Sequence, residues 1–246
     1  MIKSQQFDDG RFEIILSRPE RRNALDLEAM EALRACLKAA VSSDAKCLIL
    51  RGSGGVFCAG RDLKEAATLT QEQALKQHQI WGEVFQNLRA LSFPSVAIVE
   101  GAAVAGGFTL AMATDFLIAE ATAKFGALEM ANGFPAAMCT PILANKVHSR
   151  LGLELALFGT LETAARLHAA GLINRIAVGE EALRGESENF INHILTLDNI
   201  AVRQTVAAYR AAEAQPYEQS LTAGITLNQL IEASGKFRQG GSKFSS

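Results

Sequence analysis

Phe57-Cys58-Ala59-Gly60-Arg61-Asp62 and Gly101-Ala102-Ala103-Val104-Ala105-Gly106-Gly107 are two small-residue turns, and each follows an apolar run typical of a strand. The second turn is predicted to open a helix, and a lone carboxylate follows in Phe125-Gly126-Ala127-Leu128-Glu129. Two turns of this kind can aim two backbone N–H groups at one oxygen, which is how a protein stabilises the enolate of a thioester. These segments therefore predict a site that stabilises a developing negative charge on a ligand oxygen.

Strand-like and helix-like segments alternate around these turns. Short continuous apolar runs at residues 47–50, 95–99 and 116–119 are typical of strands buried on both faces. Apolar residues recur three or four apart at 27–37, and a capping-box signature at 70–73 precedes a second apolar stripe, which predicts two helices. Such alternation predicts parallel βαβ units and therefore an α/β fold.

The two halves of the chain differ in character. Alternating residues at 11–16 predict an early strand, whereas the chain from about Pro141 onward is mostly helical with one short strand at 174–178. No internal repeat or low-complexity linker separates the halves, and the tail at 239–246 is expected to fray. With 246 residues, the chain can bury a sizeable core as one large domain or two small ones.

The composition argues against several classes of protein. The formal net charge is −2 and no long basic run occurs, so nucleic acid is not an expected partner. No apolar run approaches the roughly 20 residues that cross a membrane. Residues 1–8 lack the apolar centre of a signal peptide. We therefore expect a cytoplasmic protein that binds neither nucleic acid nor a membrane.

The cysteines and histidines show no metal-binding pattern. No two cysteines form a CxxC pair, so buried reduced thiols are expected. Cys58 in the first turn could be a nucleophile, but nothing near it in the sequence supplies a base. The histidines lack ligand spacing, so no metal is expected. These residues are Cys36, Cys47, Cys58, Cys139, His78, His148, His168 and His193.

The order and spacing of the two turns and of the Phe125–Glu129 segment resemble the crotonase superfamily, also called the enoyl-CoA hydratase/isomerase family. The resemblance covers residues 10–180 with specific motifs. It implies a crotonase-like spiral of ββα units, in which residues 1–180 carry the CoA-binding and oxyanion-hole segments. Residues 181–246 would be a helical region that builds a homotrimer or, by pairing of trimers, a hexamer.

The same resemblance assigns roles within the two turns. The N–H of Arg61 and the N–H of Gly106 would form the oxyanion hole, and Gly107 would let the following helix pack closely. The Arg61 side chain could meet a CoA phosphate or be a solvated charge. The segments that would bind coenzyme A contain Arg22, Ala24, Ala59, Gly60, Asp62 and Leu63. No cofactor is implied beyond the coenzyme A that is part of an acyl-CoA substrate.

Glu129 is the side chain that the resemblance implies for proton transfer. Family hydratases use two glutamates, and Thr109 stands at the position of the other one. A threonine there could orient a water molecule, bond to the substrate, or bond back to its own helix. A single carboxylate can move a double bond, whereas the addition of water normally uses two acid/base groups. The sequence therefore favours enoyl-CoA isomerisation by Glu129.

Two other functions stay open from the sequence. The first is an enoyl-CoA hydratase in which another group assists Glu129, and the second is a protein that binds acyl-CoA without turning it over. Phe134 and Met138 follow Glu129 and could line an apolar acyl pocket or pack in the core. The identity of the acyl chain depends on side chains from distant segments, so the sequence does not give it.

Overall fold

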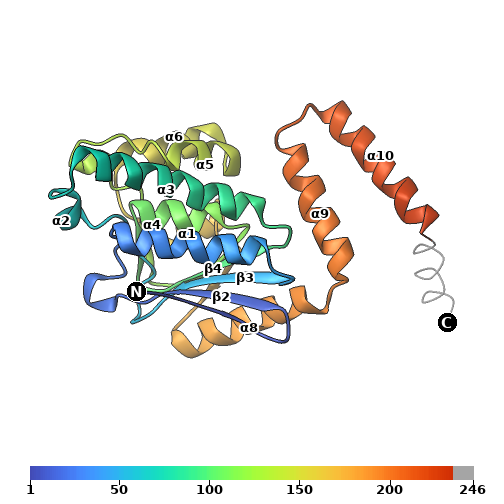
Figure 1. Cartoon of the computed structure of the whole chain (residues 1–246), viewed down its shortest axis with the longest axis horizontal. Coiled ribbons are helices and arrows are strands. Elements are labelled where there is room, and N and C mark those ends of the chain that lie inside the picture. The colour runs from blue at the N-terminus through green and yellow to red at the C-terminus, as the bar shows by residue number, and fades with distance from the viewer. Residues whose placement is uncertain (235–246) are drawn as a thin grey trace. The chain divides into compact units, whose positions relative to one another are not determined.

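A six-stranded sheet is the frame of the chain in the computed structural model, which describes residues 1–234 (Figure 1). Its strands lie in the order β1-β2-β3-β4-β6-β9, and every neighbouring pair is parallel except β1 with β2. They are β1 (Ile2–Gln6), β2 (Arg11–Leu16), β3 (Cys47–Gly52), β4 (Ser95–Val99), β6 (Phe116–Glu120) and β9 (Arg175–Ala177). The parallel sheet with helical connections confirms the predicted α/β class.

A second, smaller sheet contains β5 (Ala102–Val104), β7 (Lys124–Gly126) and β8 (Glu162–Thr163). β5 pairs with β7 in parallel, and β7 pairs with β8 antiparallel. The prediction of a plain turn at 101–107 is therefore wrong, because its centre is a strand. Strands of two or three residues are too short to show a period-two pattern, so β5, β7 and β8 were not predicted.

Helices connect the strands and form the C-terminal part of the described chain. Residues 19–21 and 130–132 are 3-10 turns, η1 (Pro19–Arg21) and η2 (Met130–Asn132). The α-helices of the described residues are α1 (Leu27–Val41), α2 (Leu63–Ala66), α3 (Gln71–Ala90), α4 (Gly106–Ala113), α5 (Cys139–Lys146), α6 (Ser149–Phe158), α7 (Ala164–Ala169), α8 (Glu180–Thr196), α9 (Asn199–Ala212) and α10 (Tyr217–Ala233).

Both faces of the six-stranded sheet are covered. Leu48 and Leu50 of β3 belong to the main core, which also contains buried residues of α1, α3 and α4. Cys47 of the same strand belongs to a second cluster with Leu183 and Ile194 of α8. Figure 1 shows α1 and α3 on one side of the sheet and α8 on the other. Since successive side chains of a strand point to opposite faces, β3 is apolar from Cys47 to Leu50, the part that is buried on both faces.

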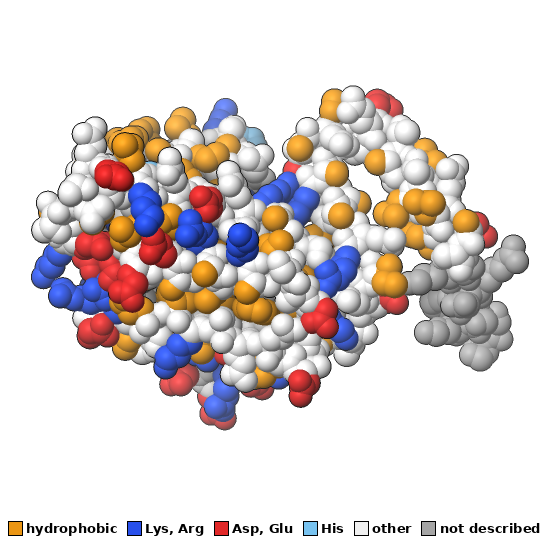
Figure 2. Space-filling model, viewed as in Figure 1, with side chains coloured by type: hydrophobic (Ala, Val, Ile, Leu, Met, Phe, Trp, Pro, Cys, Tyr) orange, Lys and Arg blue, Asp and Glu red, His pale blue; other side chains and the backbone are white. Residues whose placement is uncertain are grey.

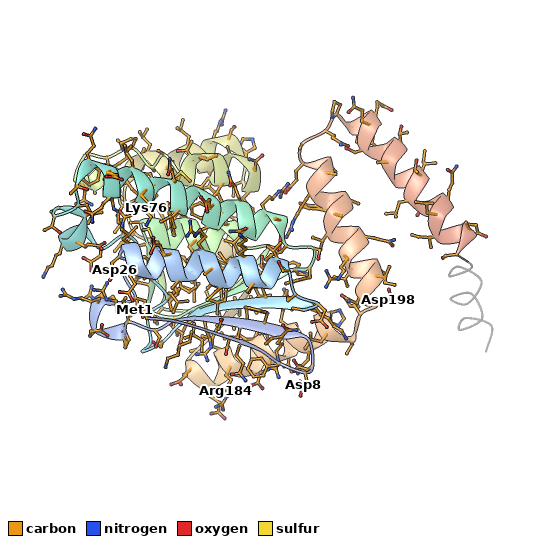
Figure 3. All side chains as sticks on the ribbon, in the orientation of Figure 1. Met1, Asp8, Asp26, Lys76, Arg184 and Asp198 are labelled. Atoms are coloured by element: carbon orange, nitrogen blue, oxygen red, sulfur yellow. The ribbon has the colours of Figure 1, made fainter. Side chains whose placement is uncertain are left out.

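Side-chain caps begin the two long helices near the site. The Asp26 carboxylate, at the start of α1 in Figure 3, accepts from the Ala29 N–H at 2.8 Å. At α3 the predicted capping box is confirmed. Thr70 N–H donates to Gln73 Oε1 at 2.9 Å, and Gln73 N–H donates to Thr70 Oγ1 at 3.2 Å. These bonds satisfy N–H groups that a helix start leaves without partners.

The chain divides into two compact units, Met1–Asn199 and Ile200–Ser246. Helix α8 contacts β3, β6 and β9 of the sheet. The predicted domain border after residue 180 therefore lies at the start of a helix that packs on the sheet, whereas the border between the two compact units lies after Asn199. The second unit contains α9 and α10, in whose described residues no side chain is buried. Its remaining part, 235–246, with the tail expected to fray, lies outside the described residues.

No helix within residues 1–234 combines the length and the apolar character that a membrane-spanning helix requires.

Replacing Thr70 tests the capping box of α3. Thr70→Ala removes the side-chain bond at the start of the helix, so the free energy of unfolding should fall by about 1 kcal/mol. Thr70→Ser keeps a hydroxyl acceptor and is the matched control, which should stay close to the unmodified protein. Chemical denaturation measures both values, and equal losses in the two variants would contradict the proposed cap.

Candidate active site

Segment 22–25 holds the first predicted turn in place through backbone hydrogen bonds. Ala59 N–H donates to Arg22 O at 3.0 Å, and Leu25 N–H donates to Gly60 O at 2.8 Å. Asp62 N–H then donates to Leu25 O at 2.9 Å. The structure thus brings together the two segments that were predicted to bind coenzyme A. Leu63, the last of those residues, begins α2 and is exposed.

Strand β5 holds the other side of the same turn. Cys58 N–H donates to Ala102 O at 3.1 Å, and Val104 N–H donates to Cys58 O at 3.0 Å. The start of α4 packs closely behind, because a β-carbon at Gly107 would lie only 2.1 Å from Cys58 O. Glycine is therefore required at 107, as the resemblance implied for close helix packing.

The N–H groups of Arg61 and Gly106 lie close together. A β-carbon at Gly60 would lie 2.8 Å from the Gly106 nitrogen, and one at Gly106 would lie 3.7 Å from the Arg61 nitrogen. Within residues 1–234, neither the Arg61 N–H nor the Gly106 N–H donates a hydrogen bond. The Gly106 N–H also stands at the positive end of α4. Two adjacent, unused donors can stabilise one developing negative charge on an oxygen.

Ala105 adopts a strained conformation immediately before α4. Its φ of 48° and ψ of −128° are unusual for a residue with a β-carbon. Ala105 N–H donates to Gly126 O of β7 at 2.8 Å, which ties this residue to the second sheet. Strain of this kind persists only where surrounding contacts enforce it.

Glu129 follows β7 and presents an oxygen without a partner. Its side chain is half-buried, and its Oε2 atom is buried with no hydrogen-bond partner among the described residues. Burial raises the pKa of Glu129, although its own backbone N–H opposes that rise. The Glu129 carbonyl accepts from the N–H groups of Asn132 and Phe134, each at 3.0 Å. The backbone is therefore fixed while the carboxylate is free to exchange a proton.

Thr109 bonds back to its own helix, which is one of the three alternatives left open by the sequence. Its hydroxyl donates to Ala105 O at 3.3 Å, and the residue is 1% exposed. The Cys139 thiol lies beside it. Burial raises the pKa of Cys139 to about 12, the nearby Glu129 charge adds to that rise, and a hydrogen bond with the Thr109 side chain opposes it. Thr109, Cys139 and Glu129 are therefore neighbours.

The cysteines are free thiols, and Cys47, Cys58 and Cys139 are buried as expected, whereas Cys36 is only half-buried. Burial raises the pKa of Cys58 to about 12, and a bond from the Gly60 N–H only partly opposes this shift. A thiol with such a pKa stays protonated near neutral pH, which argues against a nucleophilic Cys58. No group of three His, Cys, Asp or Glu side chains within residues 1–234 is arranged to hold a metal ion.

The Arg61 side chain is half-buried, and its Nε atom is buried without an acceptor in the described part of the chain. Burial lowers the pKa of Arg61, and the charge of Glu65 opposes this effect. The Nε atom is therefore shielded from solvent, although the side chain as a whole is partly exposed. A contact with a CoA phosphate stays a prediction.

Arg18 and Asn23 support the first turn, and the sequence analysis missed both roles. Arg18 Nη1 lies 2.9 Å from Asp26 Oδ2 and 3.0 Å from Asp62 Oδ2, so it links the caps of α1 and α2. The buried Asn23 donates from Nδ2 to Val56 O at 2.6 Å and accepts from Arg18 N–H at 2.8 Å. The arginine–proline pair and the asparagine at 18–23 are typical of a turn, and this local pattern does not indicate the bonds to distant residues.

Two large apolar side chains that follow Glu129 lie outside the core. Phe134 is 52% exposed and Met138 is 37% exposed in the chain. The alternative that these two side chains pack in the core is therefore wrong. Their suggested contact with an apolar acyl group stays a prediction.

Comparisons with known proteins give the family of the chain. A family model described as enoyl-CoA hydratase/isomerase matches residues 6–245. The chain is 32% identical over 231 residues to enoyl-CoA hydratase domain-containing protein 3, mitochondrial, of Rattus norvegicus, covering 92% of this chain and 74% of the relative. It is 28% identical over 243 residues to 1,2-epoxyphenylacetyl-CoA isomerase of Escherichia coli strain K12, covering 96% of this chain and 92% of the relative.

A solved structure shares the fold. An enoyl-CoA hydratase from Polaromonas sp. JS666 has a TM-score of 0.89 at 27% identity, and the match covers 99% of this chain and 96% of that chain. The crotonase-like fold inferred from the sequence is thereby confirmed.

Replacing Gly60 tests the close approach of the two turns. Gly60 has a φ of +86°, and a β-carbon there would meet the Gly106 nitrogen at 2.8 Å. Gly60→Ala should therefore lower the free energy of unfolding by about 1–3 kcal/mol. Gly82→Ala is the matched control, because a β-carbon in the middle of α3 meets no atom within 4 Å. Chemical denaturation should show no loss for Gly82→Ala, and equal stability of the two variants would contradict the geometry.

Proposed function

Because the chain belongs to the enoyl-CoA hydratase/isomerase family, we propose that it binds an acyl-CoA thioester between the two turns and Glu129. The carbonyl oxygen of the thioester accepts from the Arg61 N–H and the Gly106 N–H. Charge that develops on this oxygen is stabilised by donors that are already in place, so little reorganisation is needed during the reaction. The enzyme is an enoyl-CoA isomerase or an enoyl-CoA hydratase, in keeping with the names of its relatives.

We favour isomerisation, and the unpartnered Glu129 Oε2 is the observation that supports it most. In this proposal the Glu129 carboxylate takes a proton from the α-carbon of a β,γ-unsaturated acyl-CoA. The electrons of the broken C–H bond form a dienolate whose oxygen lies between the two N–H groups. Glu129 then returns the proton to the γ-carbon, and the double bond moves to the α,β position. One carboxylate performs both transfers.

Hydration is the second candidate, supported by relatives that are named enoyl-CoA hydratases. The residues around Glu129 favour hydration less than isomerisation. Thr109 is buried and its hydroxyl is engaged with Ala105 O, so it is poorly placed to activate water. A second acid/base group contributes about 10²–10⁴-fold to such a reaction. A binding protein without turnover is a third candidate, and the free Glu129 carboxylate argues against it.

Coenzyme A is proposed to lie along the two segments that the backbone bonds of the first turn bring together. Arg22 is exposed on one of them, and the half-buried Arg61 carries a free Nε on the other. Either guanidinium suits an anionic phosphate, because its planar donors match phosphate oxygens. No further cofactor is proposed.

A homotrimer, or a hexamer of paired trimers, is proposed for the assembled enzyme. The helices of the second unit carry large apolar side chains that are exposed in the single chain, and Figure 2 shows hydrophobic side chains along α10. They are Ile200, Tyr209, Tyr217, Leu221, Ile225 and Leu230. Apolar faces of this kind are typical of surfaces that another chain covers. The cytoplasmic location stays a prediction.

Two substrates separate the candidate reactions. The purified protein is incubated with a β,γ-unsaturated acyl-CoA and, separately, with an α,β-unsaturated one, and the absorbance of the conjugated enoyl-thioester is followed. Isomerisation predicts a rise with the first substrate and little loss with the second. A fall with the second substrate alone would establish hydration in its place.

Glu129→Gln should remove the base while it preserves the shape of the side chain. We expect turnover to fall by about 10²–10⁴-fold, with binding of a CoA ester retained. Glu83→Gln is the control, since it removes an exposed carboxylate that pairs with Arg34 at 3.1 Å. Undiminished turnover in Glu129→Gln would overturn the role of Glu129.

The pH dependence of kcat/KM tests the ionisation state of Glu129. The base must be ionised, so activity should be lost as the pH falls through the pKa of Glu129. Since burial raises this pKa, the loss should begin above the usual glutamate value of about 4.3. An acidic limb at or below that value would contradict the proposed environment of Glu129.

A further inference from the structure

The peptide group between Ala105 and Gly106 determines where the second oxyanion donor points. Peptide groups are planar, and no cis peptide bond occurs in the described chain, so the Ala105 carbonyl and the Gly106 N–H point in opposite directions. Any contact that fixes Ala105 O therefore fixes the direction of the Gly106 N–H as well.

Thr109 supplies two bonds to this oxygen. Its backbone N–H donates to Ala105 O at 3.1 Å, and its hydroxyl donates to the same oxygen at 3.3 Å. The first bond is the ordinary start of an α-helix and would exist with any residue at 109. The second bond depends on a hydroxyl and is specific to serine or threonine.

The peptide group between Ala105 and Gly106 needs the Thr109 hydroxyl bond because the backbone of Ala105 is strained. Its φ of 48° and ψ of −128° are disfavoured, and one side of the residue is held by the bond from its N–H to Gly126 O. The hydroxyl of Thr109 holds the other side, at the carbonyl. Relaxation of Ala105 would rotate the peptide plane and turn the Gly106 N–H away from the Arg61 N–H.

The surroundings of Thr109 leave its hydroxyl few other partners. Thr109 and Cys139 are each 1% exposed, and the Thr109 side chain also hydrogen-bonds with the Cys139 thiol. The hydroxyl bond to Ala105 O therefore lies in a site that is closed to solvent. Two hydrogen bonds accepted by Ala105 O polarise the peptide group, which strengthens the Gly106 N–H as a donor.

We propose that Thr109 is a positioning residue that aims the Gly106 N–H at the thioester oxygen through its hydroxyl bond to Ala105 O. The proposal rests on the proposed oxyanion role of Gly106, but not on the choice between isomerisation and hydration. It gives Thr109 a function in this chain other than that of a second base. Thr109 acts through the peptide and does not itself touch the substrate.

Thr109→Val tests the proposal, because valine keeps the branched shape and the backbone bond but lacks the hydroxyl. We expect kcat to fall about tenfold with KM little changed, which is less than the ~10²–10³-fold cost of losing an oxyanion donor outright. Thr109→Ser restores a hydroxyl and should recover most of the lost kcat. A fall in kcat that serine does not rescue would overturn the proposal.

Thr114→Val is the matched control. Thr114 lies at the other end of α4 and is 3% exposed. Its hydroxyl oxygen lies 2.7 Å from the carbonyl oxygen of Ala111 and 2.9 Å from that of Phe116, and its one hydrogen is shared between them. Loss of its hydroxyl should lower stability without a selective effect on kcat. Equal effects of Thr109→Val and Thr114→Val on stability and on kcat would mean that the Thr109 hydroxyl is only a structural helix bond.

A second measurement does not depend on turnover. Acetoacetyl-CoA forms an enolate that absorbs in the near ultraviolet, and an aimed pair of N–H donors should lower the pKa at which the bound ester becomes an enolate. Thr109→Val should raise that pKa by about one unit relative to the unmodified protein, the equivalent of the tenfold loss. Thr114→Val should leave it unchanged.

The two measurements separate this proposal from the proposed reaction. A protein that turns over neither enoyl-CoA, yet shows the pKa rise in Thr109→Val, would refute the reaction and support the positioning role. An active protein whose Thr109→Val variant keeps both kcat and the enolate pKa would refute the positioning role alone. If the unmodified protein does not lower the enolate pKa, the oxyanion role of Gly106 and the positioning role both fail.

Discussion

The close contact between Gly60–Arg61 and Ala105–Gly106 is the constraint on which the site depends. No β-carbon fits at Gly60 or Gly107, because the two turns pack directly against each other there. This close packing places the Arg61 N–H and the Gly106 N–H side by side. The segments meet because β3, β4 and β6 are neighbouring parallel strands, so their carboxyl ends lie at one edge of the sheet. Both turns and Glu129 come from the connections that follow these strands, which is where ligands bind in many α/β sheets.

The two halves of the site are prepared in different ways. The Arg61 N–H and the Gly106 N–H have no acceptor among the described residues, so both donors are available to a ligand oxygen. Burial raises the pKa of Glu129 by disfavouring the charged carboxylate. A base whose pKa lies closer to the working pH transfers protons in both directions more readily, as a double-bond shift requires.

Contacts from several elements hold the strained backbone of Ala105 and the first turn in place. Ala105 is held by β7 through Gly126 and by α4 through Thr109, while the first turn is held by segment 22–25 and by β5. Arg18 adds a half-buried link between Asp26 and Asp62. Since each support comes from a different part of the chain, the geometry of the donors is a property of the whole first unit.

The sequence by itself determined the α/β class, the main strands, the cap of α3, and the two glycine-containing segments with Glu129. Those features depend on residues that are close together in the chain, such as a stripe of apolar residues or Thr70 with Gln73. Only the tertiary structure decided the short strands β5, β7 and β8, the roles of Arg18 and Asn23, the exposure of Phe134, and the proximity of Thr109, Cys139 and Glu129. These features depend on distant segments that packing brings into contact, and a local pattern carries no record of such contacts.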